Sequence, residues 1–295
     1  MKQKLCELFT GFVMSLAVWN FAMAEPIEIA TPLVPGGAVD LTARAISKAL
    51  TEAGIESVVT YRPGGNGDIA RQHVLQKQDN VILVASSATF VFTNVTANRE
   101  NVYTQQMTLV GPTLTNAMVF LTKNKYSSIG DLVADAKTQP ITCGVSNAHG
   151  EIELQRMNKN YGTKFVPVLY KGTGQLIPDL LGGHVTCGYD QIAPYTGLTD
   201  KLLFLATSEP WKNTIPAVSA ALPGYTYHTW YASAVPNNSN LLKNKRLMTI
   251  LANWTQRQDL VQPLLDRSFQ LTQPNADLNS QAQHETQKYI KLLKQ

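Results

Sequence analysis

Four short loops hold the residues of this chain that are best suited to binding chemistry. They span residues 35–40, 62–67, 146–150 and 170–174, and each is rich in glycine or hydroxyl side chains. Each loop follows a stretch with strand character and precedes a stretch with helical periodicity. The first turn of a helix has free N–H groups and a partial positive charge, and glycine lets these groups approach an anion closely. The pattern indicates a site for a small anion; the alternative is four tight turns without a ligand.

The loop at Ser146 also allows an interpretation as a serine hydrolase. Residues 144–148 read Gly-Val-Ser-Asn-Ala, which is close to the Gly-x-Ser-x-Gly nucleophile elbow. Asp190 and His228 follow in the order of a hydrolase triad. A serine at the start of a helix is more often a helix cap, so we expect no enzyme activity and keep hydrolysis through Ser146 as an alternative.

The sequence lacks the common signatures of cofactor sites. The run Gly172-Thr173-Gly174 has no third glycine, because residue 177 is isoleucine, and no Gly-Lys-Ser/Thr phosphate loop occurs. We therefore expect no nucleotide cofactor, and the histidines give no reason to expect a metal. The histidines are scattered without the spacing of metal ligands, at His73, His149, His184, His228 and His284.

The N-terminus has the three parts of a secretory leader. Lys2 and Lys4 precede an apolar run over residues 8–21, and Ala22-Met23-Ala24 completes the cleavage signal. We expect cleavage after Ala24 and an exported protein that is free in solution; the alternative is an uncleaved anchor. Without the leader the formal charge falls from +4 to +3, too weak and too scattered for a nucleic-acid surface.

Two cysteines remain after the leader, Cys143 and Cys187, both in segments with strand character. An oxidising compartment allows them to form a disulfide, and two separately buried thiols are the alternative.

Strand-like and helical stretches alternate along the chain, which predicts an α/β protein with mostly parallel sheets. The expected strands are residues 27–33, 57–61, 80–86, 141–145, 165–169, 184–189 and 202–206, and an extended segment covers 225–235. A looser stretch rich in Thr and Asn follows residue 86. Helices are expected over 39–53, 128–136, 239–257 and 279–293, and from about residues 68, 151 and 175. No repeat or low-complexity linker interrupts the pattern, so two lobes joined by crossing strands are favoured over separate domains.

Several motifs together resemble the substrate-binding receptors of tripartite tricarboxylate transporters, also called Bug receptors. They are the runs at residues 32–40, 62–67, 166–174 and 179–185, followed by Thr229-Trp230-Tyr231. The resemblance extends over essentially the whole chain after the leader.

This resemblance implies a periplasmic, two-lobed type II binding protein, monomeric and without a cofactor, whose cleft closes on a small organic acid. The ligand would be a di- or tricarboxylate, an amino acid or an aromatic acid, and the partner would be a membrane permease; no nucleic acid is expected. Lobe 1 would combine residues 25–122 with 226–295, and lobe 2 would be 123–225. A ligand sensor for a signalling partner is the alternative. The resemblance also places the strands of Cys143 and Cys187 side by side, which favours the disulfide.

The resemblance also implies a set of ligand contacts on both lobes. Asp40 is expected to order its loop rather than touch an anion, since like charges repel. Two departures from the family pattern are a shorter loop at Ser146 and an aromatic residue at Phe90, which would either stack on a ring of the ligand or pack beneath its loop. The expected contacts are Pro35, Gly36, Gly37, Ala38, Asp40, Ser86, Ser87, Ala88, Thr89, Ser146, Asn147, His149, Gly172, Thr173 and Asp190.

Overall fold

The structure is a computed structural model that describes residues 25–123, 125–209, 214–225, 227–272 and 277–294. The expected leader and its cleavage site lie outside the described residues. No helix in the described part of the chain has the length and apolar character needed to span a membrane.

The first strands form a parallel group, which we call the N-terminal strand group. It comprises β1 (Ile27–Thr31), β2 (Ser57–Tyr61) and β3 (Val81–Ser86), in the order β2-β1-β3. Helices α1 (Ala38–Glu52) and α2 (Asp68–Lys77) make the crossovers. β1 and β3 are buried along their whole length, as expected for parallel strands that are covered on both faces.

A second parallel group, the middle strand group, comprises β5 (Ile141–Val145), β6 (Phe165–Leu169) and β7 (Cys187–Gln191), in the order β7-β5-β6. It is accompanied by α5 (Ile129–Thr138), α6 (Ala148–Tyr161) and α7 (Thr173–Gly182). The short strand β8 (Leu203–Thr207) runs antiparallel to β4.

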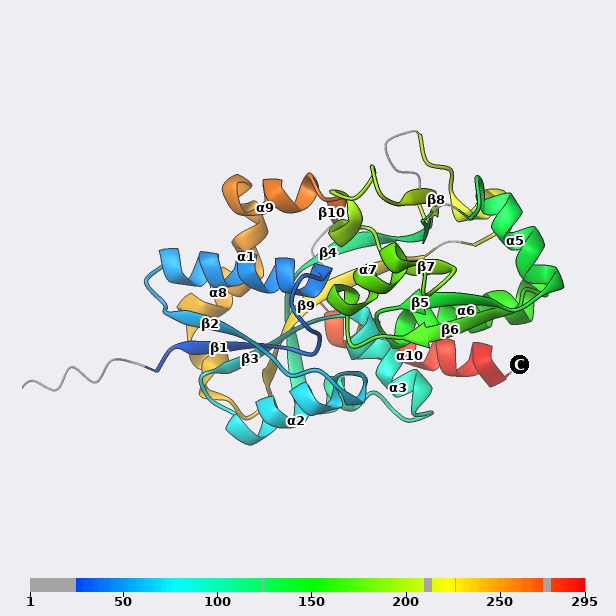
Figure 1. The fold of residues 1–295 in the computed structure, drawn as a ribbon. Coiled ribbons are helices and arrows are strands. Elements are labelled where there is room, and N and C mark those ends of the chain that lie inside the picture. The colour runs from blue at the N-terminus through cyan, green and yellow to red at the C-terminus, as the bar shows by residue number, and fades with distance from the viewer. Residues whose placement is uncertain (1–24, 124, 210–213, 226, 273–276, 295) are drawn as a thin grey trace, which may run out of the picture.

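Two long antiparallel strands connect the groups, β4 (Met107–Thr122) and β9 (His228–Pro236). β9 pairs with β3 and with the first part of β4, whereas the end of β4 pairs with β7, so the sheet order is β2-β1-β3-β9-β4-β7-β5-β6. Figure 1 shows the blue and cyan N-terminal group and the green middle group on opposite sides of these strands. The predicted α/β class is confirmed.

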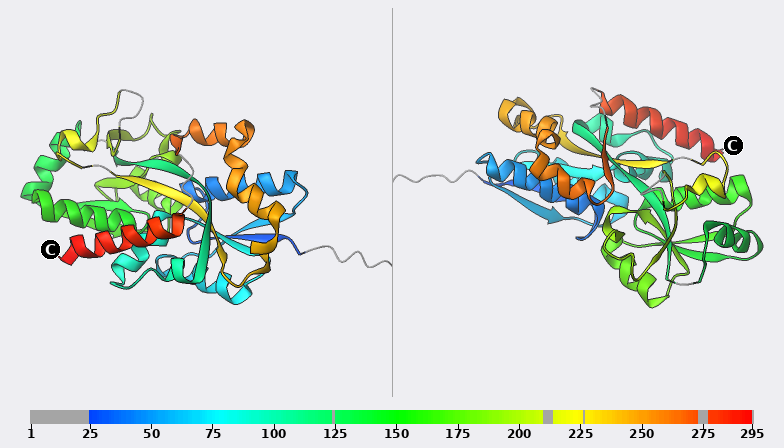
Figure 2. Two further views of the ribbon diagram at one scale, coloured as in Figure 1. Left: turned by 180° about the vertical axis from the view of Figure 1, so that it is seen from behind. Right: turned by 90° about the horizontal axis from the view of Figure 1, so that it is seen from above.

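The C-terminal part of the chain returns to the N-terminal strand group. α8 (Lys245–Asn253) and α9 (Gln258–Leu265) pack against α1, and β10 (Phe269–Leu271) pairs with β4. The helix predicted over 239–257 is interrupted by 3₁₀ turns at Asn240–Lys243 and Trp254–Gln256. α10 (Leu278–Lys294) ends the chain and packs on the segment after β3 (Figure 2).

The stretch after residue 86 was predicted to be loose, and this prediction is wrong. It forms a π-helical turn at Ala88–Phe92, continues as α3 (Thr93–Thr96), and is followed by α4 (Val102–Gln106). Phe90 and Phe92 are fully buried, and Phe92 packs edge-on against Tyr289 of α10. The tertiary contacts of its aromatic residues therefore outweigh the weak helix propensity of Thr and Asn.

Candidate functional site

A cavity of about 270 Å³ lies where strands of both groups end. Its walls come from the residues that follow β1, β2, β3 and β5 and from the end of β6. Ligands of open α/β sheets bind at this position, because the carboxyl ends of the strands and the starts of the next helices converge there. The lining residues are Pro32, Leu33, Gly64, Gly65, Asn66, Gly67, Ala88, Thr89, Ser146, Asn147, Ala148, Leu169, Tyr170 and Lys171.

Four of the predicted ligand contacts line this cavity: Ala88, Thr89, Ser146 and Asn147. The other predicted residues lie outside its lining, and the paragraphs below describe what several of them contact. They are Pro35, Gly36, Gly37, Ala38, Asp40, Ser86, Ser87, His149, Gly172, Thr173 and Asp190.

The sequence-based set missed the loop after β2, which lines the cavity from Gly64 to Gly67. The signal was present, because this loop is one of the four glycine-rich junctions. Gly67 has φ +102°, and a Cβ there would lie 2.7 Å from the side chain of Thr89, so the loop packs directly on the start of the next helical segment. Only the tertiary fold reveals this contact, since it joins the ends of two different strands.

Asp190 connects the loops of the middle strand group through hydrogen bonds, although it does not itself line the cavity. It is fully buried and accepts hydrogen bonds from the hydroxyls of Ser146 at 2.5 Å and Thr173 at 2.7 Å. Tyr195 and the N–H of Gln191 are its further donors, at 3.1 and 2.8 Å. Burial raises the pKa of Asp190, and the hydrogen bonds from Ser146 and Thr173 partly offset this effect. Asp190 thereby joins the starts of α6 and α7 to the end of β7.

Asp40 orders the loop at the start of α1. Its carboxylate accepts the N–H of Gly36 at 3.0 Å, and Arg44 and Tyr61 donate to its other oxygen at 2.9 and 2.6 Å. These partners account for both oxygens of Asp40, in line with the expected role within its own loop.

The loop after β1 touches the loop after β6 across the gap between the strand groups. The N–H of Val34 donates to the carbonyl of Lys171 at 3.3 Å. A Cβ at Gly172 would lie 2.8 Å from the side chain of Val34, and one at Gly174 would lie 2.5 Å from the carbonyl oxygen of Pro35. We call this contact between residues 33–37 and 170–174 the clasp. It brings the two backbones together beside the cavity, and its glycines leave the space that this approach needs.

Phe90 packs beneath its loop, so the interpretation as a ring-stacking ligand contact is wrong. It is fully buried, stacks on Trp230 with ring centroids 5.8 Å apart, and meets Tyr103 edge-on at 5.7 Å. His149 is likewise a core residue, between the rings of Phe92 and Tyr227 at centroid distances of 4.5 and 3.8 Å.

The geometry at Ser146 is not that of a catalytic nucleophile. Its hydrogen is donated to the carboxylate of Asp190, whereas the nucleophile of a hydrolase triad donates to an imidazole. Among the described residues, no three His, Cys, Asp or Glu side chains are grouped so that they could hold a metal ion.

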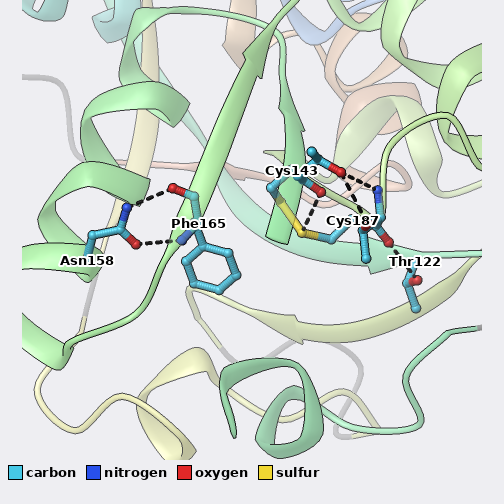
Figure 3. Close-up of a disulfide and its surroundings, with 7 residues drawn as sticks. Thr122, Cys143, Asn158, Phe165 and Cys187 are labelled. Carbon is cyan, nitrogen blue, oxygen red and sulfur yellow. Dashed lines mark hydrogen bonds between the residues drawn. A yellow bond between two sulfur atoms is a disulfide. The ribbon is translucent and has the colours of Figure 1, made fainter. Parts of the chain in front are cut away.

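Cys143 and Cys187 form a disulfide in the structure (Figure 3). They occupy paired positions of the parallel strands β5 and β7, with Cα atoms 4.5 Å apart. Nearby, the amide of Asn158 in α6 makes two hydrogen bonds of 2.8 Å to the backbone of Phe165 and so ties the helix to β6. The strands under the Ser146 loop are therefore covalently joined.

Sequence comparison finds bacterial proteins that are similar to this chain. No protein-family model matches it. It is 29% identical over 215 residues to a UPF0065 protein of Bordetella bronchiseptica, a match that covers 68% of this chain and only 64% of that protein. It is 25% identical over 237 residues to the protein BugT of Bordetella pertussis, covering 74% of this chain and 72% of BugT.

Solved structures of two bacterial proteins have the same fold. Rpa4515 of Rhodopseudomonas palustris, solved with adipate, superposes with a TM-score of 0.82 at 20% identity, over 92% of this chain and 97% of that one. MatC of the same organism, solved with bound malate, superposes with a TM-score of 0.81 at 16% identity, over 92% of this chain and 99% of that one. The sequence relatives and the shared fold agree with the motifs at the strand ends, and the chain is therefore similar in sequence to a Bug protein and in fold to solved binding proteins such as BugD.

Proposed function

We propose that this chain is a periplasmic receptor that binds a small organic acid in the cavity between the two strand groups and delivers it to a membrane permease of the tripartite type. The observation that carries the proposal is the cavity of about 270 Å³ at the carboxyl ends of strands from both groups. A helical turn begins there at Ala88 and a helix at Ala148, and the first N–H groups of such segments are suited to a carboxylate.

The charge of the cavity wall supports an anionic ligand. Among the described lining residues Lys171 is the one with a charged side chain, and no acid lines the cavity. The arginine near the glycine loop, Arg62, is already paired with Glu28 at 3.2 Å. Adipate and malate, the acids bound by Rpa4515 and MatC, are both small dicarboxylic acids.

We propose that the two strand groups are the cores of two lobes, with residues 25–122 and 226–295 in lobe 1 and residues 123–225 in lobe 2. Ligand entry then requires the clasp to open, because residues on both sides of it, Leu33 and Lys171, also line the cavity. In this proposal the leader directs export, cleavage follows Ala24, and the receptor acts as a monomer.

Thermal stabilisation by ligand tests the proposal. The mature chain is melted with di- and tricarboxylates, amino acids and aromatic acids, each well above its expected dissociation constant. A ligand at a hundred times its Kd stabilises the folded state by about 2.7 kcal/mol, which raises the Tm of a protein of this size by about 5 °C or more. Absence of a shift with every compound would contradict the proposal.

The receptor carries no chemistry of its own in this proposal. This view is supported by the hydrogen bond that the Ser146 hydroxyl donates to Asp190. Hydrolysis of p-nitrophenyl acetate by the purified chain is expected to equal the rate without protein. Ester hydrolysis that the substitution Ser146→Ala abolishes would instead favour a hydrolase.

A further inference from the structure

The hydrogen atom of the Ser146 hydroxyl points away from the cavity. Each oxygen of the buried Asp190 carboxylate accepts two hydrogen bonds. Oδ1 accepts from Ser146 at 2.5 Å and from the N–H of Gln191 at 2.8 Å. Oδ2 accepts from Thr173 at 2.7 Å and from Tyr195 at 3.1 Å. Because an ionised carboxylate can only accept, the single hydroxyl hydrogen of Ser146 must lie on the bond to Asp190.

The side chain of Asn147 determines which hydrogen bond the oxygen of Ser146 accepts. The Oδ1 atom of Asn147 accepts the N–H of Gly150 at 3.2 Å, as the cap of α6, and this bond decides which way the amide faces. The Nδ2 atom of Asn147 then donates to Oγ of Ser146 at 3.1 Å. A hydroxyl oxygen has two lone pairs, so Ser146 keeps one free acceptor position and no free hydrogen, whereas Asn147 keeps one amide hydrogen.

Both residues line the cavity, where Ser146 is 1% and Asn147 is 7% exposed, so the acceptor position of Ser146 stands directly beside the donors of Asn147. A carboxylate placed against Ser146 would set oxygen against oxygen without a hydrogen between them. Asn147 and the first turn of α6 offer N–H groups to a carboxylate one residue further on. We infer that Ser146 accepts a hydrogen bond from the ligand, and that the ligand bears a hydroxyl or ammonium group on the carbon next to a carboxylate. The inference rests on the proposed function and deepens it.

Asp190 acts in this arrangement through Ser146 as a positioning residue. It fixes the direction of the serine hydrogen, and its negative charge lies one hydrogen bond behind the acceptor position. That charge favours an ammonium group over a hydroxyl group, because the attraction between opposite charges is stronger in a buried site than in water. Two preferences can therefore be measured separately: 2-hydroxy over plain acid, and 2-amino over 2-hydroxy acid.

Calorimetric titration of the mature chain at pH 7.5 with matched acids tests the inference. The pairs lactate and propionate, malate and succinate, and 2-hydroxyglutarate and glutarate each differ by one hydroxyl. Alanine, aspartate and glutamate supply the 2-amino members. Among acids of the chain length that binds, the 2-hydroxy or the 2-amino acid is expected to bind at least about tenfold more tightly than the unsubstituted acid. This is the gain expected from one additional hydrogen bond to a polarised acceptor.

Two variants assign these preferences to their residues. Ser146→Ala removes the acceptor and should bring the ratio of 2-hydroxy to plain acid to about one. In Asp190→Asn the N–H of Gln191 keeps the amide oxygen on the Ser146 side, so the preference of 2-amino over 2-hydroxy acid should fall while that of 2-hydroxy over plain acid persists. Ser208→Ala is the matched control, because Ser208 is a buried serine that accepts the N–H of Met118 at 3.0 Å and does not line the cavity.

The outcomes separate this inference from the proposed function. Binding of the plain acids as tightly as their substituted partners would overturn the inference and leave the receptor function intact. Failure of every carboxylate to bind would overturn the receptor function itself. A variant that only perturbs the fold would weaken all the acids equally, so ratios unchanged in Ser146→Ala would also overturn the inference. Circular dichroism checks folding, and Asp190→Asn alone decides the charge effect if Ser146→Ala does not fold.

Discussion

The pKa values of two buried carboxylates are shifted in opposite directions by their surroundings. Burial raises the pKa of both Asp190 and Glu28. The donors to Asp190 are neutral hydroxyls and an N–H group, and its pKa stays raised. Glu28 of β1 instead accepts hydrogen bonds from Thr60, His73 and Arg62, which outweigh burial and bring its pKa to about 2. The hydrogen bond from the Thr60 hydroxyl lowers the pKa of Glu28 most, and the bonds from His73 and Arg62 add to it.

Glu28 should make the fold sensitive to acid. A carboxylate whose pKa is lowered by folding stabilises the protein above its unfolded pKa, and this contribution is lost as the pH falls through the folded value. The window for Glu28 therefore runs from about 4.5 down to about 2. At neutral pH, Glu28→Gln should lower the free energy of unfolding by up to roughly 3 kcal/mol. Urea titrations at several pH values measure this difference from wild type.

The pH dependence distinguishes the charge of Glu28 from simple loss of packing. The deficit of Glu28→Gln should shrink as the pH falls through that window, whereas a packing defect would persist at all pH values. Glu56→Gln, at an exposed position just before β2, is the control and should match wild type throughout. A deficit that does not depend on pH would argue against the role of the charge.

At the scale of the elements, the disulfide joins two adjacent strands that the chain connects only through β6 and two helices. Cys143 in β5 and Cys187 in β7 enclose a sequence separation of 44 residues that contains α6, β6 and α7. The elements that carry Ser146 and Thr173 therefore lie within one covalently closed loop, which restricts the unfolded chain.

Reduction of this disulfide should lower stability. A closed loop of this length stabilises a protein by about 2–4 kcal/mol. Melting of the mature chain with and without dithiothreitol is expected to show a lower Tm in the reductant. The double variant Cys143→Ala/Cys187→Ala should melt at the lower temperature in both conditions. Two free thiols in the denatured, unreduced protein would show instead that the cysteines are not bridged.

At the scale of the whole molecule, the two strand groups are connected by the continuous strands β4 and β9, by the clasp, and by the packing of α6 on the residues after β3. The first connection is covalent and permanent, whereas the clasp rests on one backbone hydrogen bond from Val34 to Lys171 and on close approach at Gly174. Contacts of this kind can open without unfolding either group, as lobe motion requires.

Gly174→Ala should weaken ligand binding because it prevents the clasp from closing, without disturbing the fold of either strand group. The added Cβ would lie 2.5 Å from the backbone oxygen of Pro35, which cannot turn aside as a side chain can. The affinity for any ligand found by thermal stabilisation is expected to fall about tenfold or more, with little change in the Tm of the ligand-free protein. Gly197→Ala is the matched control, because a Cβ there meets nothing within 4 Å. Unchanged affinity in Gly174→Ala would show that the clasp is not needed for binding.

The sequence by itself determined the α/β class, most strand and helix positions and the four glycine- or hydroxyl-rich junctions, because these depend on periodicity and on the residues at each turn. The loops at 62–67, 146–150 and 170–174 all contribute to the cavity. Local pattern was misleading for residues 88–96, where a run of Thr and Asn predicted loose structure and buried aromatic residues impose helical turns.

Only the tertiary structure decided which residues face the ligand and with which atoms. Ser146 is recognisable in the sequence as a residue at a helix start, but its role as an acceptor depends on Asp190, 44 residues away. The clasp likewise joins Val34 to Lys171, which belong to different strand groups. Hydrogen-bond direction and closure depend on partners brought together by the fold, and no pattern of neighbouring residues encodes them.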